Sequence, residues 1–153
     1  MTKPLHLLGR DADDLSIISA CLQDAVTWRA DMAYLKRERR FALVLNRYCW
    51  ERETADNGEP ARVRTGLHFD NVLTVKSQGI SRGRKIPLEL LALQVEDGER
   101  PTVRFHFAGG ASILLDVECL DCQMHDLSHP WTTHTRPEHR AVDEDGEDEA
   151  GGG

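Results

Sequence analysis

The sequence predicts an α+β fold: a strongly bent antiparallel sheet of six or seven strands, with an N-terminal amphipathic helix and a short C-terminal helix. Short runs rich in β-branched, aromatic and leucine residues fill the stretch from Ala25 to Asp121. Turn residues bound most of these runs, which is typical of antiparallel strands. A chain of 153 residues suits one domain and can bury roughly 68–70% of its unfolded surface.

The N-terminal part predicts a short edge strand over residues 5–8, followed by a helix. The acidic segment 11–14 supplies a side-chain oxygen to cap free amides and negative charge at the positive end of the helix dipole. A helix of about three turns with one buried stripe should follow, ending near Gln23 or Asp24. The apolar residues at helical spacing are Leu15, Ile18, Cys21 and Leu22.

The central part predicts a series of strands joined by polar turns. One or two strands are expected between Ala25 and Leu35, and one long strand or a pair bent around Asp70-Asn71 is expected between Arg62 and Gln78. The other strand-like runs are 41–50, 88–95, 103–107 and 111–117. The expected turns are the charged segment 36–40, Asn57-Gly58, 96–99 and 108–110, where consecutive glycines accept positive φ.

The segment from Cys119 to Leu127 changes its hydrophobic period. Leu120, Met124 and Leu127 lie four and three residues apart, which predicts a closing helical turn or short helix packed on the sheet. Beyond it the chain becomes polar, proline-punctuated and then acidic. We therefore assign residues 1–132 to a single α+β domain and residues 133–153 to a disordered acidic tail.

The net charge of −7 is concentrated near the C-terminus. Six acids lie between Asp143 and Glu149, and removing them from the total of 26 leaves 20 acids against 19 basic residues, or about −1. That balance predicts no nucleic-acid partner. The apolar cluster at residues 5–8 is too short for a signal peptide or a membrane span. We therefore expect a cytoplasmic protein whose four cysteines are reduced thiols.

A cluster of cysteines and histidines invites a metal or redox interpretation. Cys119-x-x-Cys122-x-x-His125-x-x-x-His129 contains half of a zinc pattern, but a structural zinc site usually draws a second ligand pair from a distant turn. Cys119 also continues the alternation of residues 113, 115 and 117, which points it towards the core. We favour core packing for the cysteines and predict no metal or other cofactor.

The candidate binding residues lie in two basic loops. Arg37, Arg39 and Arg40 lie in the first loop, and the second loop contributes Arg82, Arg84 and Lys85. The second loop lacks the order of a phosphate-binding loop and leads to Pro87 in place of a helix. Together the loops could form a basic rim for a phosphorylated or acidic partner. Charged turns that block edge-to-edge sheet pairing would explain the same residues.

Several segments in combination resemble a known family. They are Asp14-Leu15, Ile18-Ser19, 22–26, 40–47, Trp50-Glu51, 67–69, 72–77, 108–111 and 115–119. The chain is similar up to about Pro137 to the bacterial family catalogued as domain of unknown function 2948. That resemblance implies no activity and no site. The rhythm Leu67-x-Phe69-x-x-Val72-x-x-Val75, followed by hairpin strands and a terminal helix, resembles pleckstrin-homology-like half-barrels.

Two functional hypotheses follow from these observations. We favour a non-catalytic cytosolic binding or adaptor module, which uses an open sheet edge or the basic loops to hold a protein or an acidic ligand. The acidic tail could compete for the basic rim, in which case deleting residues 143–149 raises affinity for anionic partners. The alternative is a metal- or thiol-dependent enzyme that uses Cys119, Cys122 and His125. No local nucleophile signature demands an enzyme.

Overall fold

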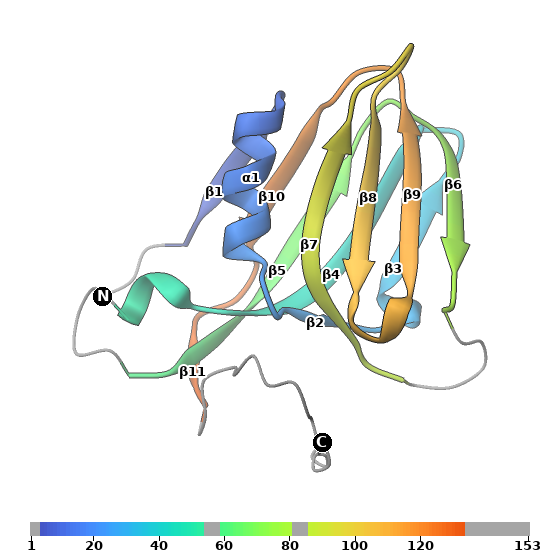
Figure 1. Ribbon diagram of the computed structural model, residues 1–153. Helices are drawn as coiled ribbons and strands as arrows, with labels where there is room; N and C mark the ends of the chain where they lie inside the picture. Colours follow the sequence, from blue (N-terminus) through green and yellow to red (C-terminus); the bar gives the residue numbers. More distant parts are fainter. Residues whose placement is uncertain (1–3, 54–58, 81–85, 134–153) are drawn as a thin grey trace.

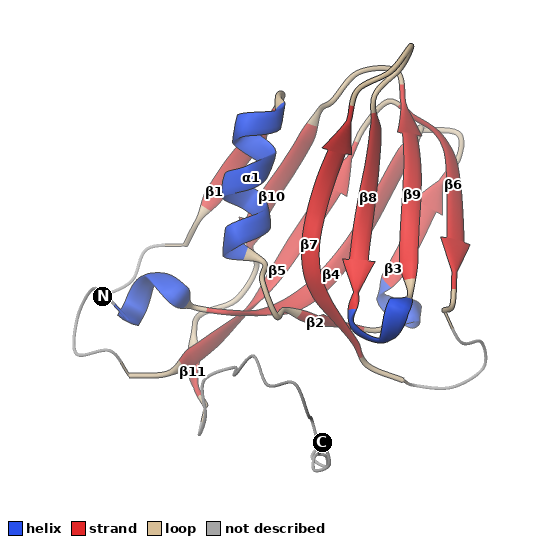
Figure 2. Cartoon of the chain, viewed as in Figure 1, coloured by secondary structure: helices blue, strands red, loops and turns tan. Residues whose placement is uncertain are grey.

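The computed structural model describes residues 4–53, 59–80 and 86–133. Within these ranges the chain forms an antiparallel sheet of 11 strands that folds over into two facing layers, with one α-helix beside them (Figure 1, Figure 2). The antiparallel sheet is confirmed. The predicted fold class was nevertheless wrong, because the sheet has 11 strands where six or seven were expected, and a strand replaces the closing helix.

The first layer is built around two long central strands. Its order is β1 (His6–Gly9), β10 (Cys122–Asp126), β5 (Ala61–Phe69) and β4 (Arg40–Tyr48). On its other side β4 pairs with both β2 (Val26–Thr27) and β3 (Met32–Leu35), and the short β11 (Trp131–Thr132) pairs with β5. Short 3-10 turns, η1 (Arg29–Asp31) and η2 (Trp50–Glu53), precede β3 and follow β4.

The second layer faces the first and is reached through β2. Its order is β7 (Leu88–Glu96), β8 (Thr102–Phe107), β9 (Ser112–Val117) and β6 (Val72–Gln78). The strand β2 pairs with β4 and with β7, so it joins the layers at one corner. Within the described residues β3 pairs only with β4 and β6 only with β9. Both strands therefore present a free edge to the same side of the molecule (Figure 1).

The single helix α1 (Ala12–Cys21) covers the opposite side, against β1 and β7 (Figure 1). Asp11 caps it as expected, because its carboxylate accepts a hydrogen bond of 2.8 Å from the backbone amide of Asp14. Leu15, Ile18 and Leu22 are buried in the core. The Ser19 hydroxyl accepts a bond of 2.9 Å from the amide of Leu93, which ties the helix to β7.

Alternating side chains of the two layers form one core between them. Phe105 of β8 packs edge-to-face on Phe41 of β4 and Phe69 of β5, with ring centroids 5.7 Å apart in both pairs. All three rings are buried. Burying such a side chain contributes about 1.5–3 kcal/mol, so this contact between the layers is a principal source of stability.

The segment predicted as a closing helix is the strand β10. Its backbone pairs with β1 on one side and β5 on the other, with Met124 opposite both Leu7 and Leu67. The spacing of Leu120, Met124 and Leu127 is compatible with a helix. Between β1 and β5, however, the segment can hydrogen-bond to both neighbours only if its backbone is extended. Long-range pairing therefore overrides the local period.

The stretch between Arg62 and Gln78 was expected to be one long strand or a bent pair, and it is a pair. The two strands lie in different layers. The chain turns between them at Asn71, whose φ of 61° is in the left-handed region that asparagine tolerates. The expected Asn57-Gly58 turn and residues 134–153 of the predicted tail lie outside the described residues. No helix in the described ranges is long and apolar enough to span a membrane.

Candidate ligand-binding cleft

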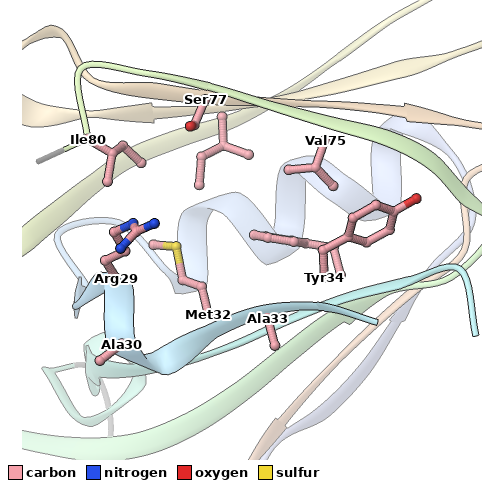
Figure 3. A pocket seen from close by; sticks show the side chains of 10 residues that line it. Arg29, Ala30, Met32, Ala33, Tyr34, Val75, Ser77 and Ile80 are labelled. Carbon is pink, nitrogen blue, oxygen red and sulfur yellow. The ribbon is translucent and has the colours of Figure 1, made fainter. Parts of the chain in front are cut away.

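A cleft opens where the two layers part, between the free edges of β3 and β6 (Figure 3). Its volume is about 370 Å³, which lies at the small end of the range for small-molecule sites. The cleft exists because β2 joins the layers only at one corner, and no described strand bridges β3 and β6. It therefore gives solvent access to the edge of the core.

Apolar side chains form the floor and part of the walls of this cleft. Phe41 from the first layer and Ile113 from the second are buried at its base. Met32, Val75 and Ile80 are half-buried along its walls. These residues occupy inward positions of their strands or follow directly after one, so the same alternation that builds the core also lines the opening.

Three polar side chains also line the cleft. The Tyr34 hydroxyl lies 3.1 Å from the carbonyl oxygen of Val72 and 3.0 Å from that of Leu73, so it bridges β3 to β6. Near the same end the amide of Val72 donates a bond of 2.9 Å to the carbonyl of Arg39. Ser77 and Arg29 line the remaining part, with Arg29 exposed (Figure 3). These hydrogen bonds close one end of the cleft.

The lining residues limit the chemistry that the cleft can perform. Among the described residues, its walls include no histidine, cysteine or carboxylate. A serine hydroxyl without a neighbouring base is a poor nucleophile. Arg29 is permanently charged and cannot act as a general base. The arrangement is suited to holding a ligand.

The structure does not bring the predicted thiol and histidine cluster together. Cys122 is fully buried, and burial, with Asp121 and Asp14 nearby, raises the pKa of its thiol to about 12. The expectation that Cys119 faces the core is wrong, since it is exposed and its sulfur lies 3.3 Å from Nδ2 of Asn71. His125 lies on the opposite face of β10 from Cys122 because the two are three residues apart in a strand.

The metal interpretation gains no support from other side chains either. In the part of the chain that the structure describes, no three histidine, cysteine, aspartate or glutamate residues gather closely enough to hold a metal ion. The alternative enzyme hypothesis therefore has no assembled site among these residues.

The first basic loop is partly neutralised by carboxylates. Nε of Arg40 lies 2.7 Å from Asp70, and this hydrogen bond raises the pKa of the arginine. Arg39 lies 3.5 Å from Glu118 in a pair whose side chains are both more than half exposed. Arg37 is exposed. The second loop, with Arg82, Arg84 and Lys85, lies outside the described residues.

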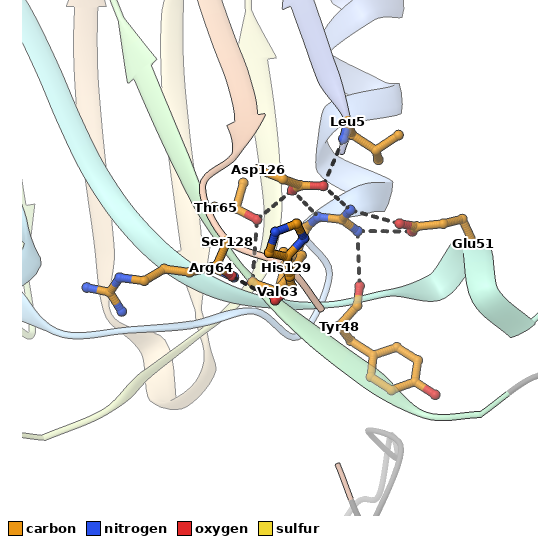
Figure 4. Close-up of polar contacts among 10 residues, drawn as sticks. Leu5, Tyr48, Glu51, Val63, Arg64, Thr65, Asp126, Ser128 and His129 are labelled. Carbon is orange, nitrogen blue, oxygen red and sulfur yellow. Dashed lines mark hydrogen bonds and ion pairs between the residues drawn. The ribbon is translucent and has the colours of Figure 1, made fainter. Parts of the chain in front are cut away.

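Sequence reasoning missed a buried ionic network around Arg47 (Figure 4). The Arg47 side chain has no exposed surface, and its guanidinium bonds to Asp126 at 3.0 and 2.9 Å and to Glu51 at 3.0 and 2.8 Å. A fifth bond, of 3.3 Å, reaches the carbonyl of Tyr48. All five N–H donors of the guanidinium are used, so this arginine has no donor left for a ligand.

The signal for that network was present in the sequence. Arg47 is in phase with Phe41, Leu43 and Leu45, so strand alternation places its charge on the buried face. Its partner Asp126 is 79 residues away and could not be identified from spacing. Burial acts to raise the pKa of Asp126, but hydrogen bonds from Arg47, the Leu5 amide and Thr65 hold that pKa below its usual value.

A second hollow, of about 410 Å³, lies over the first layer. Its walls include Gly66, Leu127 and two histidines, His68 and His125. Burial and the neighbouring Arg40 lower the pKa of His68. The carboxylate in its lining, Asp31, already lies 4.0 Å from Arg64. We place the candidate site in the first cleft, because Arg29 lines it beside an apolar floor. This arginine forms no ion pair with another described residue.

Comparison with known proteins yields one match. A family model described as "Protein of unknown function (DUF2948)" matches residues 5–139, which is most of the chain. Neither the curated proteins nor the solved structures contain a match. The description of this family names no ligand and no activity.

Proposed function

The chain belongs to the DUF2948 family, and from its geometry we propose that it is a non-catalytic binding module that holds a small ligand in the cleft between β3 and β6. The observation that carries this proposal is the cleft itself. Buried Phe41 and Ile113 form an apolar floor, and Arg29, Tyr34 and Ser77 supply polar groups along it. Mostly apolar concavities with a few convergent polar groups are the usual form of ligand sites.

The free edges of β3 and β6 also support a binding role. Unpaired edges of a sheet present backbone donors and acceptors, and proteins usually cover or charge them. The edges here flank a cleft whose ends differ, since Tyr34 closes one end and Ser77 lies nearer the other. A ligand that enters between the edges would cover exposed apolar surface and find polar groups along the way. We further propose a cytoplasmic location, where the four free thiols remain reduced.

A fluorescent apolar probe tests this proposal. We expect anilinonaphthalene sulfonate to bind the wild-type protein at one saturable site. Ser77→Phe places a large side chain in the cleft and should weaken that binding by at least about tenfold, or ~1.4 kcal/mol. The matched control is Gln78→Phe, because the neighbouring residue is exposed and points to the opposite face of β6.

The controls decide the interpretation of this experiment. Both variants should keep the circular dichroism spectrum and melting temperature of the wild-type protein, since both positions are exposed. Equal probe affinity in a folded Ser77→Phe variant and in the wild type would contradict the proposal. If Ser77→Phe fails to fold, methyl NMR on the wild-type protein replaces it, with probe-induced shifts expected at Val75, Ile80 and Ile113.

A further inference from the structure

We propose that the ligand of this cleft is an aliphatic carboxylate, with one apolar chain lying over Phe41 and Ile113 and its single anionic head group paired with Arg29. The inference rests on the proposed function and adds the chemical class of the ligand. It follows from how charge and apolar surface are distributed over the lining of the cleft.

The apolar part of the cleft suits an aliphatic chain. Two buried side chains at the floor and three half-buried side chains on the walls come from both layers of the sheet, so an inserted chain would be contacted from two sides. Each methylene buried there contributes about 0.8 kcal/mol. A volume of about 370 Å³ fits a single chain and not a lipid with several chains.

The charged part of the cleft selects the head group. Among the described lining residues, Arg29 is the one that carries a charge, and none of them is a carboxylate. Its sequence neighbour Asp31 lines the other hollow and pairs with Arg64. A guanidinium matches the two oxygens of a carboxylate with two parallel hydrogen bonds. The Arg29 guanidinium can pair fully with one carboxylate, and it would repel a cationic head group.

The two hydroxyl groups refine this orientation. The proton of Tyr34 is directed at backbone carbonyls of Val72 and Leu73, so this hydroxyl cannot donate to a carboxylate. Ser77 has no recorded side-chain partner among the described residues and can donate. Figure 3 shows Arg29 and Ser77 on the two sides of the cleft, with Tyr34 at its other end. The head group therefore lies near Arg29 and Ser77, and the chain runs towards Tyr34.

Calorimetric titration with three probes of equal chain length tests the head group. Decanoate, decanol and decyltrimethylammonium carry a negative, a neutral and a positive head, and each is used below its micelle concentration. We expect decanoate to bind one site at least about tenfold more tightly than decanol, and the ammonium probe to bind most weakly. Arg29→Gln should remove the advantage of decanoate and leave decanol unchanged. Arg10→Gln is the control, since Arg10 is exposed and lies outside the cleft.

The outcomes separate this inference from the function on which it rests. Equal affinity for decanoate and decanol, or an Arg29→Gln variant that keeps the preference, overturns the carboxylate assignment. If binding of both probes is still lost in Ser77→Phe, the cleft remains a binding site for another ligand class. If no probe, including anilinonaphthalene sulfonate, shifts the methyl signals of Val75, Ile80 and Ile113, both proposals fail.

Discussion

Replacing Asp126 by asparagine should destabilise the fold strongly, because it leaves the buried Arg47 with one carboxylate in place of two. Arg47 has no exposed side-chain surface and Asp126 only 3%. Removing one partner of a buried pair typically costs about 3–5 kcal/mol. Glu51 remains as a second partner but is 31% exposed, so we expect about 3 kcal/mol, the low end of that range.

Urea unfolding measures this loss. With a slope of about 2 kcal/mol per molar urea, a cost of about 3 kcal/mol lowers the midpoint by roughly 1.5 M. The matched control is Glu118→Gln, which removes a carboxylate from an exposed pair with Arg39 and should change stability by less than about 1 kcal/mol. Equal midpoint shifts in the two variants would refute the reasoning that burial sets the cost.

A double substitution sharpens the same test. Combining Arg47→Met with Asp126→Leu removes both buried charges, while the partly exposed Glu51 keeps its access to water. Replacing a buried ion pair by apolar residues is often close to neutral, so the double variant should lose less stability than Arg47→Met and Asp126→Leu lose in sum. A double variant that loses the sum of the two single costs would show that the two side chains act independently.

The same carboxylate sets a pH dependence of stability. The pKa of Asp126 is lower in the folded protein than the value of about 3.9 in an unfolded chain. Its contribution is therefore fully present above about pH 4 and is lost as the pH falls through the folded pKa. The Asp126→Asn variant should show a flatter loss of stability below about pH 4 than the wild type, in unfolding curves recorded at a series of pH values.

Two further predictions concern the contact between β1 and β10. Gly9→Ala should cost about 1–3 kcal/mol in urea unfolding, because an added Cβ would lie 2.6 Å from the Cys122 sulfur. Gly98→Ala should change little, because its added Cβ would meet the Arg100 carbonyl oxygen at an ordinary contact distance of 3.5 Å. Equal costs would contradict the tight contact at Gly9. An aromatic disulfide reagent at pH 8 should label exposed Cys119 in the native protein and Cys122 only after unfolding. The reason is that Cys122 is buried and the pKa of its thiol is about 12. Rapid labelling of Cys122 in the native protein would contradict its placement.

The alternation of apolar residues was sufficient to predict several strands and the first helix. Residues 103–107 and 112–117 alternate inward and outward in the structure as they do in the sequence. The cap at Asp11 and the stripe of Leu15, Ile18 and Leu22 predicted α1. These elements depend on neighbours within one or two turns, so local pattern determines them.

The candidate cleft could not be predicted in the same way. Its lining combines Arg29 and Met32 with Val75 and Ile113, which belong to different layers and are more than forty residues apart along the chain. Each residue has an unremarkable place in its own strand or turn. Only the separation of β3 from β6 makes these positions into one concave surface.

The sequence by itself determined a strand-rich antiparallel fold, a capped N-terminal helix and the family to which the chain belongs. Tertiary structure decided that residues 122–126 are a strand, that Arg47 finds Asp126, and that two sheet edges stay open around an apolar floor. The physical reason is that side-chain periodicity is a local property, whereas backbone pairing and the neutralisation of a buried charge require partners supplied by distant parts of the chain.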